Sequence, residues 1–241
     1  MRKLIIICEG KTEVSLINNL IAERLHSHYY PIIPVTLPVG INPAGGLNKG
    51  GFRSSSGYRY ALGKVIDVIQ IHSGAVVTTF FDLYNFPSDI ACFSDAEGVT
   101  DPVRKAVMYE EQLWRDVSAV LRSGVTFVPY LQPCETEGFV FVNPHIASRI
   151  LVGRNENEAE ALEAKLREVR ERFESPEHIN TQMGPSKHLE EILPGYRKNK
   201  VGRGGFSWRV AKEVGIEAIS LECHHLREWL NDLERLSALE Q

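Results

Sequence analysis

The chain has 241 residues, of which 43% are hydrophobic, and a formal net charge of −4. This is enough apolar material for one large domain, or for one domain with an appendage, but no apolar run approaches the roughly 20 residues of a membrane-spanning helix. The net negative charge argues against a protein that binds nucleic acid nonspecifically over its whole surface. It does not exclude a local basic groove.

The first predicted element is a strand that ends in a carboxylate. Residues 3–8 are mainly apolar and rich in isoleucine, which predicts a strand buried on both faces, and Glu9 follows directly. A helix is predicted next, from apolar residues at helical spacing: Val14, Ile17, Leu20, Ile21 and Leu25. Ligands bind at the carboxyl ends of strands in open α/β sheets, and Glu13, one helical turn on, can face the same point. The alternative is that Thr12 is a helix N-cap and Glu13 an ordinary first-turn acid.

A second strand and a glycine-rich loop come next. Residues 32–39 predict a strand near a sheet edge, because prolines punctuate it and proline cannot donate to a ladder. Residues 40–57 predict a long loop, and loops of this length are usually functional or mobile. The loop lacks the spacing of a P-loop, but Lys49 and Arg53 can contact a phosphate if it is more than a flexible connection.

Two further helix and strand pairs follow. Residues 58–71 carry a helical apolar stripe, and residues 75–81 predict a buried strand that ends in Asp82. Residues 102–122 then predict a long helix and residues 125–131 a further strand. A helix of crossover length between two buried strands is how a parallel sheet is wound.

Acids again follow the last of these strands. Because the carboxyl ends of parallel strands share one edge, we expect a convergent anionic site, and like charges brought together ordinarily need a cation. Carboxylate oxygens suit Mg²⁺ or Mn²⁺, whereas zinc would more often recruit histidine or cysteine. The candidate metal ligands are Glu9, Glu13, Asp82, Glu135 and Glu137. The local structure around residue 136 is ambiguous, so the sequence does not decide which of the last two faces the site.

The last hundred residues are mainly helical and contain one basic segment. A helical stripe predicts a structural helix through Ala159, Leu162, Leu166, Val169 and Phe173, and residues 207–239 predict short helices. Residues 193–212 hold six cations and no acid, with Tyr196, Phe206 and Trp208 among them. Such a segment can bind a nucleic-acid backbone and stack bases, or it can be a solvated loop. Its cations are Arg197, Lys198, Lys200, Arg203, Arg209 and Lys212.

The cysteines and histidines point to packing. None of Cys8, Cys92, Cys134 and Cys223 forms a CxxC pair, so we expect structural thiols. His224 and His225 are neighbours that point apart on a helix, and we expect them to be partly buried packing residues. The first apolar stretch is too short for a signal peptide, so we expect a soluble cytoplasmic protein without a membrane partner.

Together these motifs resemble a TOPRIM-like family of uncharacterised bacterial proteins. The matching motifs are CEGKTE at 8–13, KGG at 49–51, DLYNFP at 82–87, VPYLQ at 128–132, ETEGF at 135–139, the stretch 173–180, PSK at 185–187 and PGYRK at 194–198. This family is related to the nuclease module of overcoming-lysogenization-defect (OLD) nucleases and to RloB-like proteins. The resemblance implies an α/β fold, with a TOPRIM-like (Rossmann-like), mainly parallel central sheet flanked by helices. It also implies a catalytic core over 1–145 and a helical C-terminal extension over 146–241 that packs on the core.

The resemblance also implies a site. Glu9 matches the family's glutamate and Asp82 its first aspartate, both of which bind Mg²⁺. Two positions depart from the pattern: Tyr84 stands where a second aspartate is typical, and Cys134 where relatives tend to carry histidine. Glu13, Glu135 or Glu137 would then supply the missing oxygen.

The implied activity is divalent-metal-dependent hydrolysis of DNA or RNA, in anti-phage defence or DNA processing. Glu9, Asp82 and Glu137 would hold one or two ions, with Glu13 as a further ligand or a base. Lys187 and Lys198 would stabilise charge on the phosphate. The expected nucleic-acid contacts are Lys49, Arg53, Arg197, Lys198, Lys200 and Arg203.

Other classes of function stay open. Topoisomerase-like strand transfer needs a nucleophilic tyrosine that nothing singles out, and primase-like transfer needs a nucleotide site. The stronger alternative is a non-catalytic or conditionally active nucleic-acid-binding subunit of an ABC-type, SMC-like ATPase complex. The resemblance favours an ATPase partner encoded nearby, since OLD-like modules work with one and this chain has no Walker A motif. A homodimer is also left open.

Overall fold

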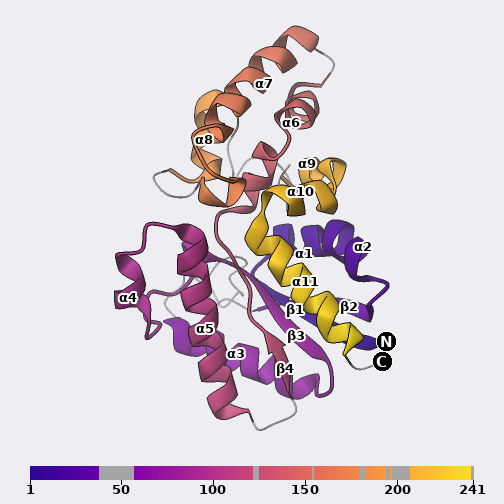
Figure 1. Ribbon diagram of the computed structural model, residues 1–241, viewed down its shortest axis with the longest axis vertical. Helices are drawn as coiled ribbons and strands as arrows, with labels where there is room; N and C mark the ends of the chain where they lie inside the picture. The colour runs from indigo at the N-terminus through magenta and orange to yellow at the C-terminus, as the bar shows by residue number, and fades with distance from the viewer. Residues whose placement is uncertain are drawn as a thin grey trace, which may run out of the picture.

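A computed structural model describes residues 1–37, 57–121, 125–153, 155–179, 183–193, 196 and 207–239, except the side chain of Asn85. Within these ranges no helix is long and apolar enough to cross a bilayer. The first and last described elements, β1 (Arg2–Cys8) and α11 (His224–Ala238), both belong to the part of the fold that contains the sheet (Figure 1).

The centre of the described structure is a five-stranded parallel sheet. Its order is β2-β1-β3-β4, and β5 pairs with β3 beyond β4. The strands are β1 (Arg2–Cys8), β2 (Tyr29–Thr36), β3 (Val76–Asp82), β4 (Thr126–Val128) and β5 (Leu131–Gln132). The expected α/β class with a central parallel sheet flanked by helices is therefore confirmed, and β2 lies at a sheet edge as its prolines predicted. β2 begins and ends three residues earlier than the predicted range of 32–39.

Side chains alternate between two helical layers along β1. Leu4, Ile6 and Cys8 face one core cluster, and Ile5 and Ile7 face the other. The first layer contains α1 (Lys11–Leu16), the π-helical turn η1 (Ile17–Ile21), α2 (Ala22–Leu25) and α11 (His224–Ala238). The second contains α3 (Gly57–Ile71), α4 (Phe93–Glu97) and α5 (Pro102–Val120). Figure 1 shows the sheet between these layers.

The direction of winding changes between β1 and β3. The connection from β1 to β2 runs through α1 and α2 on one face, and the connection from β2 to β3 contains α3 on the other. Neighbouring strands whose connections leave to opposite sides open a crevice at their carboxyl ends, where α/β proteins bind ligands. The carboxyl ends of β1 and β3 are therefore the place to look for a site.

Pro129 divides the last predicted strand into β4 and β5. Proline has no N–H to donate to the hydrogen-bond ladder of the sheet. Beside it, the Tyr130 amide donates to the Thr79 hydroxyl at 2.8 Å instead of to a backbone carbonyl. The Phe81 amide donates to the Tyr130 carbonyl at 3.3 Å. Pairing with β3 then resumes at Leu131, so the chain still reaches the carboxyl edge of the sheet.

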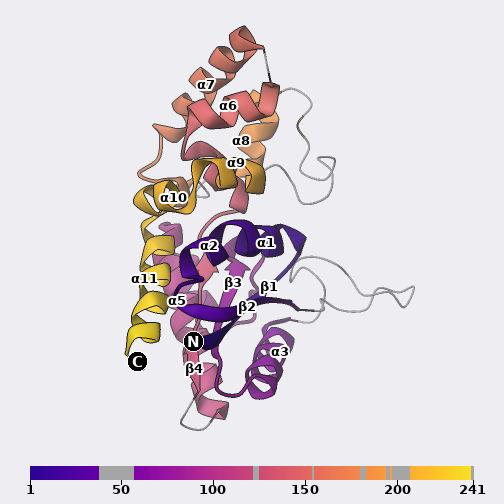
Figure 2. The same ribbon diagram turned by 90° about the vertical axis from the view of Figure 1, so that its right-hand side faces the viewer.

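A helical lobe lies beyond that edge (Figure 2). It contains α6 (Pro144–Val152), α7 (Glu156–Arg170), α8 (Pro185–Ile192), α9 (Ser207–Val214) and the short turns η3 (Thr136–Phe141) and η4 (Pro176–His178). α6 and α7 are N-capped by Asn143 and Asn155, whose side chains accept from Ile146 and Glu158 amides. The lobe has its own core, which includes Phe141, Leu162, Leu166, Leu189 and Val210.

The chain then returns to the sheet through α10 (Ile216–Glu222) and α11. The Trp229 indole donates to Thr78 Oγ1 at 2.8 Å, and the Tyr29 hydroxyl donates to the Leu233 carbonyl at 2.5 Å. α11 is thus the part of the predicted extension that covers the sheet. The division into 1–145 and 146–241 stays a prediction.

Candidate functional site

Acids follow three strands at one edge of the sheet. Glu9 comes directly after β1, Asp82 ends β3, and Glu135 lies three residues past β5. The register pairs Cys8 with Phe80 and Asp82 with Gln132, so the strands end at nearly the same level. Glu9, Asp82 and Glu135 therefore follow strand ends at one edge of the sheet, as the prediction of a parallel sheet implied.

Glu9 and Asp82 form the firmest part of the site. Glu9 is only 7% exposed, and its Oε1 accepts the backbone N–H of Asp82 at 2.9 Å. Asp82 Oδ1 accepts the backbone N–H of Tyr84 at 2.9 Å and so caps the short helix η2 (Leu83–Asn85). Each carboxylate is thus held through one oxygen at the point where the winding changes.

Glu13 lies close to the same strand end. Its Oε2 would be 3.2 Å from a Cβ placed on Gly10, so the carboxylate packs over this glycine. The pKa of the Cys8 thiol is raised by burial and further by the charges of Glu13 and Glu9. The alternative is wrong about the cap, because Gly10 is the N-cap residue and α1 already begins at Lys11, but Glu13 does lie in the first turn of α1 as that alternative expected.

Glu135 and Glu137 are both buried; Glu135 directly precedes the lobe, and Glu137 lies in its turn η3. Glu135 Oε2 accepts the backbone N–H of Ser186, near the start of α8, at 3.0 Å. Glu137 is hydrogen-bonded by the Tyr196 hydroxyl, whose pKa is raised by burial and then by the charges of Glu137 and Glu135. The two acids therefore lie near one another, and each is fixed by a partner from the lobe.

Lys187 is the predicted phosphate-binding cation that the structure describes. Its Nζ pairs with Glu190 Oε2 at 2.8 Å, and its side chain is 63% exposed. The pKa of Lys187 is raised by Glu190 and, to a smaller degree, by Glu135 and Tyr84. An exposed cation therefore lies within electrostatic reach of the acids. The other predicted basic contacts lie outside the described residues: Lys49, Arg53, Arg197, Lys198, Lys200 and Arg203.

The donor atoms at this edge have the chemistry of a site for a hard divalent cation. Carboxylate oxygens from three strand ends are the ligands that Mg²⁺ and Mn²⁺ prefer. Across the described ranges, however, no three His, Cys, Asp or Glu side chains are arranged to hold a metal ion. Glu9 and Asp82 are linked at 2.9 Å through the Asp82 backbone amide, which makes them the first candidates for ligands of such a cation.

Comparison with known proteins places the chain in a family. A family model described as a domain of unknown function (DUF4276) matches residues 8–234, a range that includes every acid of the site. The chain belongs to the DUF4276 family. A search of curated proteins gave no match, and neither did a search of solved structures. Membership in a family of unknown function agrees with the resemblance noted above, and the relationship to TOPRIM and OLD proteins stays a proposal.

Two acids of this DUF4276 chain, the buried Glu177 and the partly buried Glu110, were not predicted as functional residues from the sequence. Glu177 is 1% exposed and accepts the backbone N–H groups of His225 and Leu226 at 3.0 Å each, which caps the start of α11. Glu110 Oε1 accepts the Leu131 amide at 2.6 Å and binds His225 Nε2 at 2.8 Å. These acids fasten α11 and β5 to the rest of the fold. His225 is buried and packs as expected, whereas His224 is exposed, so the expectation that both histidines are partly buried packing residues is wrong for His224.

Cys134 is a packing residue. Its thiol contacts the Pro176 carbonyl at 3.4 Å, and a Cβ placed on Gly138 would be 2.6 Å from its Sγ. Burial raises the pKa of Cys134 well above its usual value, and the charges of Glu177 and Asp82 raise it further. The thiol is therefore protonated at neutral pH, which agrees with the structural role expected of the cysteines.

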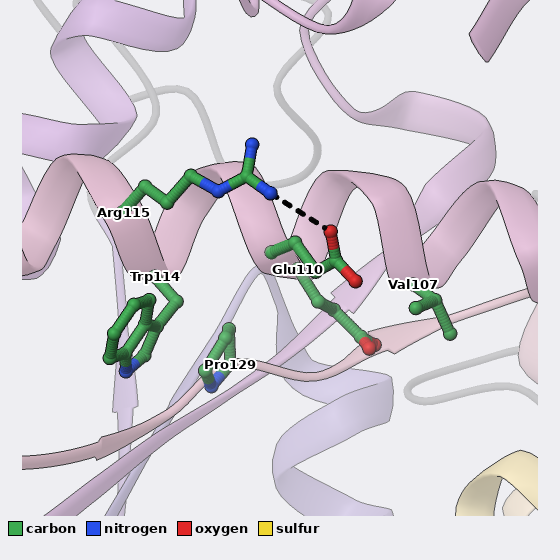
Figure 3. Close-up of a pocket in the computed structure, with 6 residues that line it drawn as sticks. Val107, Glu110, Trp114, Arg115 and Pro129 are labelled. Carbon is green, nitrogen blue, oxygen red and sulfur yellow. Dashed lines mark hydrogen bonds and ion pairs between the residues drawn. The ribbon is translucent and has the colours of Figure 1, made fainter.

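A separate cavity of about 430 Å³ lies between α5 and the chain after β4 (Figure 3). Trp114 and Pro129 line it side by side, and Arg115 forms an ion pair with Glu111 at 3.2 Å across its rim. Glu110 also lines it, so the partly buried Glu110–His225 pair lies behind this cavity. None of the candidate metal ligands lines it.

Proposed function

We propose that this DUF4276 chain is a TOPRIM-like, divalent-metal-dependent nuclease that hydrolyses phosphodiester bonds of DNA or RNA. The observation that supports this most is the Glu9–Asp82 pair, joined at 2.9 Å at the carboxyl ends of β1 and β3. These are the residues that match the TOPRIM glutamate and first aspartate, and they stand at the ligand-binding crevice of a parallel sheet.

Three acids are proposed to hold Mg²⁺ or Mn²⁺. Glu9 and Asp82 would bind the first ion through carboxylate oxygens, and Glu137 would complete the set. Glu13 and Glu135 are the candidates for further ligands. The metal would polarise the scissile phosphate and lower the pKa of an attacking water.

The chain's own groups are proposed to orient the substrate and accept a proton. Lys187, two residues from the start of α8, would attract a phosphate oxygen and is oriented by its pair with Glu190. Glu13 Oε2, which lies beside Gly10, would accept the proton of the attacking water. The hydrogen bond between the Asp82 amide and Glu9 would keep the two carboxylates in fixed relative positions.

A cleavage assay tests this function. Purified protein is incubated with supercoiled, linear and single-stranded DNA and with RNA, in Mg²⁺, in Mn²⁺ and in EDTA. We expect metal-dependent cleavage that falls by about 100-fold or more in Glu9→Gln and in Asp82→Asn. Glu111→Gln, an exposed acid on α5, is the matched control and should cleave like the wild type. Undiminished cleavage by Glu9→Gln would refute the proposed site.

The biological setting is part of the same proposal. We infer that the enzyme acts in the cytoplasm as an effector in anti-phage defence or DNA processing, with an ABC-type ATPase as partner. A chain that cleaves nothing alone, but cleaves when such an ATPase copurifies with it, would be the conditionally active subunit described above.

A further inference from the structure

An exposed aromatic ring stands at the rim of the carboxylate pair. Tyr84 is 56% exposed and lies two residues after Asp82. Its neighbour Leu83 is buried, and Phe86 packs against Phe81 and Tyr109 with ring centroids 6.0 Å and 5.7 Å apart. The chain around Tyr84 is therefore anchored in the core while the ring faces solvent.

The backbone of this turn is also fixed by hydrogen bonds. The Tyr84 amide donates to Asp82 Oδ1 at 2.9 Å, and the Phe86 amide donates to the Leu83 carbonyl at 3.2 Å. An aromatic side chain with few rotatable bonds on a fixed turn loses little conformational entropy when it binds a ligand. Tyr84 thus has the properties of a preformed binding surface.

The same rim carries a cation from the helical lobe. Lys187 is exposed and pairs with Glu190 at 2.8 Å, and its pKa is raised first by Glu190 and then by Glu135. Ser186, its neighbour, donates its amide to Glu135 at 3.0 Å and so ties this cation to the acid cluster. Tyr84, whose amide is bonded to Asp82, and Lys187, whose neighbour is bonded to Glu135, therefore both adjoin acids at the carboxyl edge of the sheet.

This combination matches the parts of a nucleotide. A cation suits the phosphate, and the face of a tyrosine ring suits a base, because every nucleobase has a π-face that stacks on aromatic side chains. In a duplex those faces are covered by neighbouring base pairs, whereas an unpaired base offers them.

We propose that Tyr84 is a stacking platform for an unpaired nucleobase, so that the substrate of this site is single-stranded nucleic acid. This inference rests on the proposed function and deepens it by naming the substrate class.

The test is a binding measurement that does not depend on cleavage. A fluorescein-labelled single strand of about 12 nucleotides, near the footprint of a single-strand-binding groove, is titrated with protein in EDTA and in Ca²⁺. The same sequence as a duplex is the comparison, and a gel confirms that both probes stay intact. We expect tighter binding of the single strand.

The variants separate the ring from its surroundings. Tyr84→Ala should weaken single-strand binding by about tenfold or more, the loss typical of one stacked base, and leave duplex binding unchanged. Tyr84→Phe and Tyr84→Trp should bind like the wild type because they keep an aromatic face. Tyr30→Ala is the matched control: Tyr30 is 75% exposed but lies at the amino end of β2, away from the site.

Equal single-strand binding by Tyr84→Ala and the wild type would overturn the platform, as would tighter binding of the duplex or no binding of either probe. The cleavage assay separates this result from the nuclease proposal. Binding that depends on Tyr84 in a protein that cleaves nothing supports the platform and counts against the nuclease. Cleavage that depends on Glu9 but is unchanged in Tyr84→Ala supports the nuclease and counts against the platform.

Discussion

At the scale of single residues, Glu9 and Asp82 have structural roles beside the chemical roles proposed for them. Glu9 accepts the Asp82 amide, and Asp82 accepts the Tyr84 amide. A buried amide without its acceptor costs free energy, so a substitution that removes the oxygen changes stability as well as chemistry. Amide variants keep an accepting oxygen, and this is why they are the right probes of function here.

The stability of Glu9 variants follows from this geometry. Glu9→Leu leaves the Asp82 N–H without its acceptor, and we expect it to lower the free energy of unfolding by about 1–3 kcal/mol. Glu9→Gln keeps the acceptor and removes one of several like charges, so it should be at least as stable as the wild type. Urea denaturation of both variants measures this. A Glu9→Leu protein as stable as Glu9→Gln would contradict the contact.

Gly138 is constrained in a different way, because neighbouring atoms pack too closely against it to leave room for a side chain. A Cβ at this position would be 2.6 Å from Cys134 Sγ and 3.3 Å from the Pro176 carbonyl. We expect Gly138→Ala to destabilise the fold by about 1–3 kcal/mol through overpacking. Adding Cys134→Ala removes the nearer atom and should recover part of the loss, which a double-mutant cycle measures. Strictly additive effects would show that the two side chains do not clash.

At the scale of elements, α11 is held by a partly buried ion pair. His225 Nε2 lies 2.8 Å from Glu110 Oε1, which also accepts the Leu131 amide. Burial alone would lower the pKa of His225, but the hydrogen bond and charge of Glu110 outweigh it and raise the pKa above its ordinary value. The protonated histidine therefore stabilises the packing of α11 on α5.

The pH dependence of this contact has a definite sign. Because the folded pKa of His225 is raised, its contribution is fully present below the unfolded value of about 6.5 and is lost as the pH rises through the folded pKa. We expect the gap in unfolding free energy between wild type and His225→Gln to narrow as the pH rises from below 6 to above that folded pKa. A gap that widens with pH would contradict the charged pair.

The elements themselves were largely predictable from local patterns. The apolar run of β1 and the helical spacing of apolar residues in α1, α3 and α5 predicted the bounds of these elements to within a few residues. These patterns are local, because each element buries one set of its own apolar side chains in the core. β2 starts earlier than predicted: its first residue is fixed by a hydrogen bond from Tyr29 to Leu233, far along the chain. The prediction placed one strand over residues 125–131, although Pro129 lies within that range. The structure has two strands there, β4 and β5, on either side of Pro129.

The candidate site was predictable only where it depends on strand ends. Glu9, Asp82 and Glu135 follow strands of one parallel sheet, so topology alone brings them to one edge. Glu177 and Glu110 were missed because their partners in α11 lie 48 and 115 positions away along the chain. No periodicity links residues at such separations.

At the scale of the whole molecule, the candidate site lies between two parts of the fold. Glu9 and Asp82 come from the sheet, whereas Glu135 and Glu137 are held by Ser186 and Tyr196 of the lobe (Figure 2). The position of the lobe therefore sets where Glu135 and Glu137 lie relative to the sheet, and a cation of the proposed kind would bridge the two parts.

The most direct test of the account is a measurement of Mn²⁺ binding by isothermal titration calorimetry. The wild type should bind Mn²⁺ and release it to EDTA. Glu9→Gln and Asp82→Asn should each weaken binding by about tenfold or more, as loss of a metal-supporting group does elsewhere, while Glu111→Gln should bind like the wild type. A wild type that binds no Mn²⁺, or a Glu9→Gln variant that binds it equally well, would contradict the proposed metal centre.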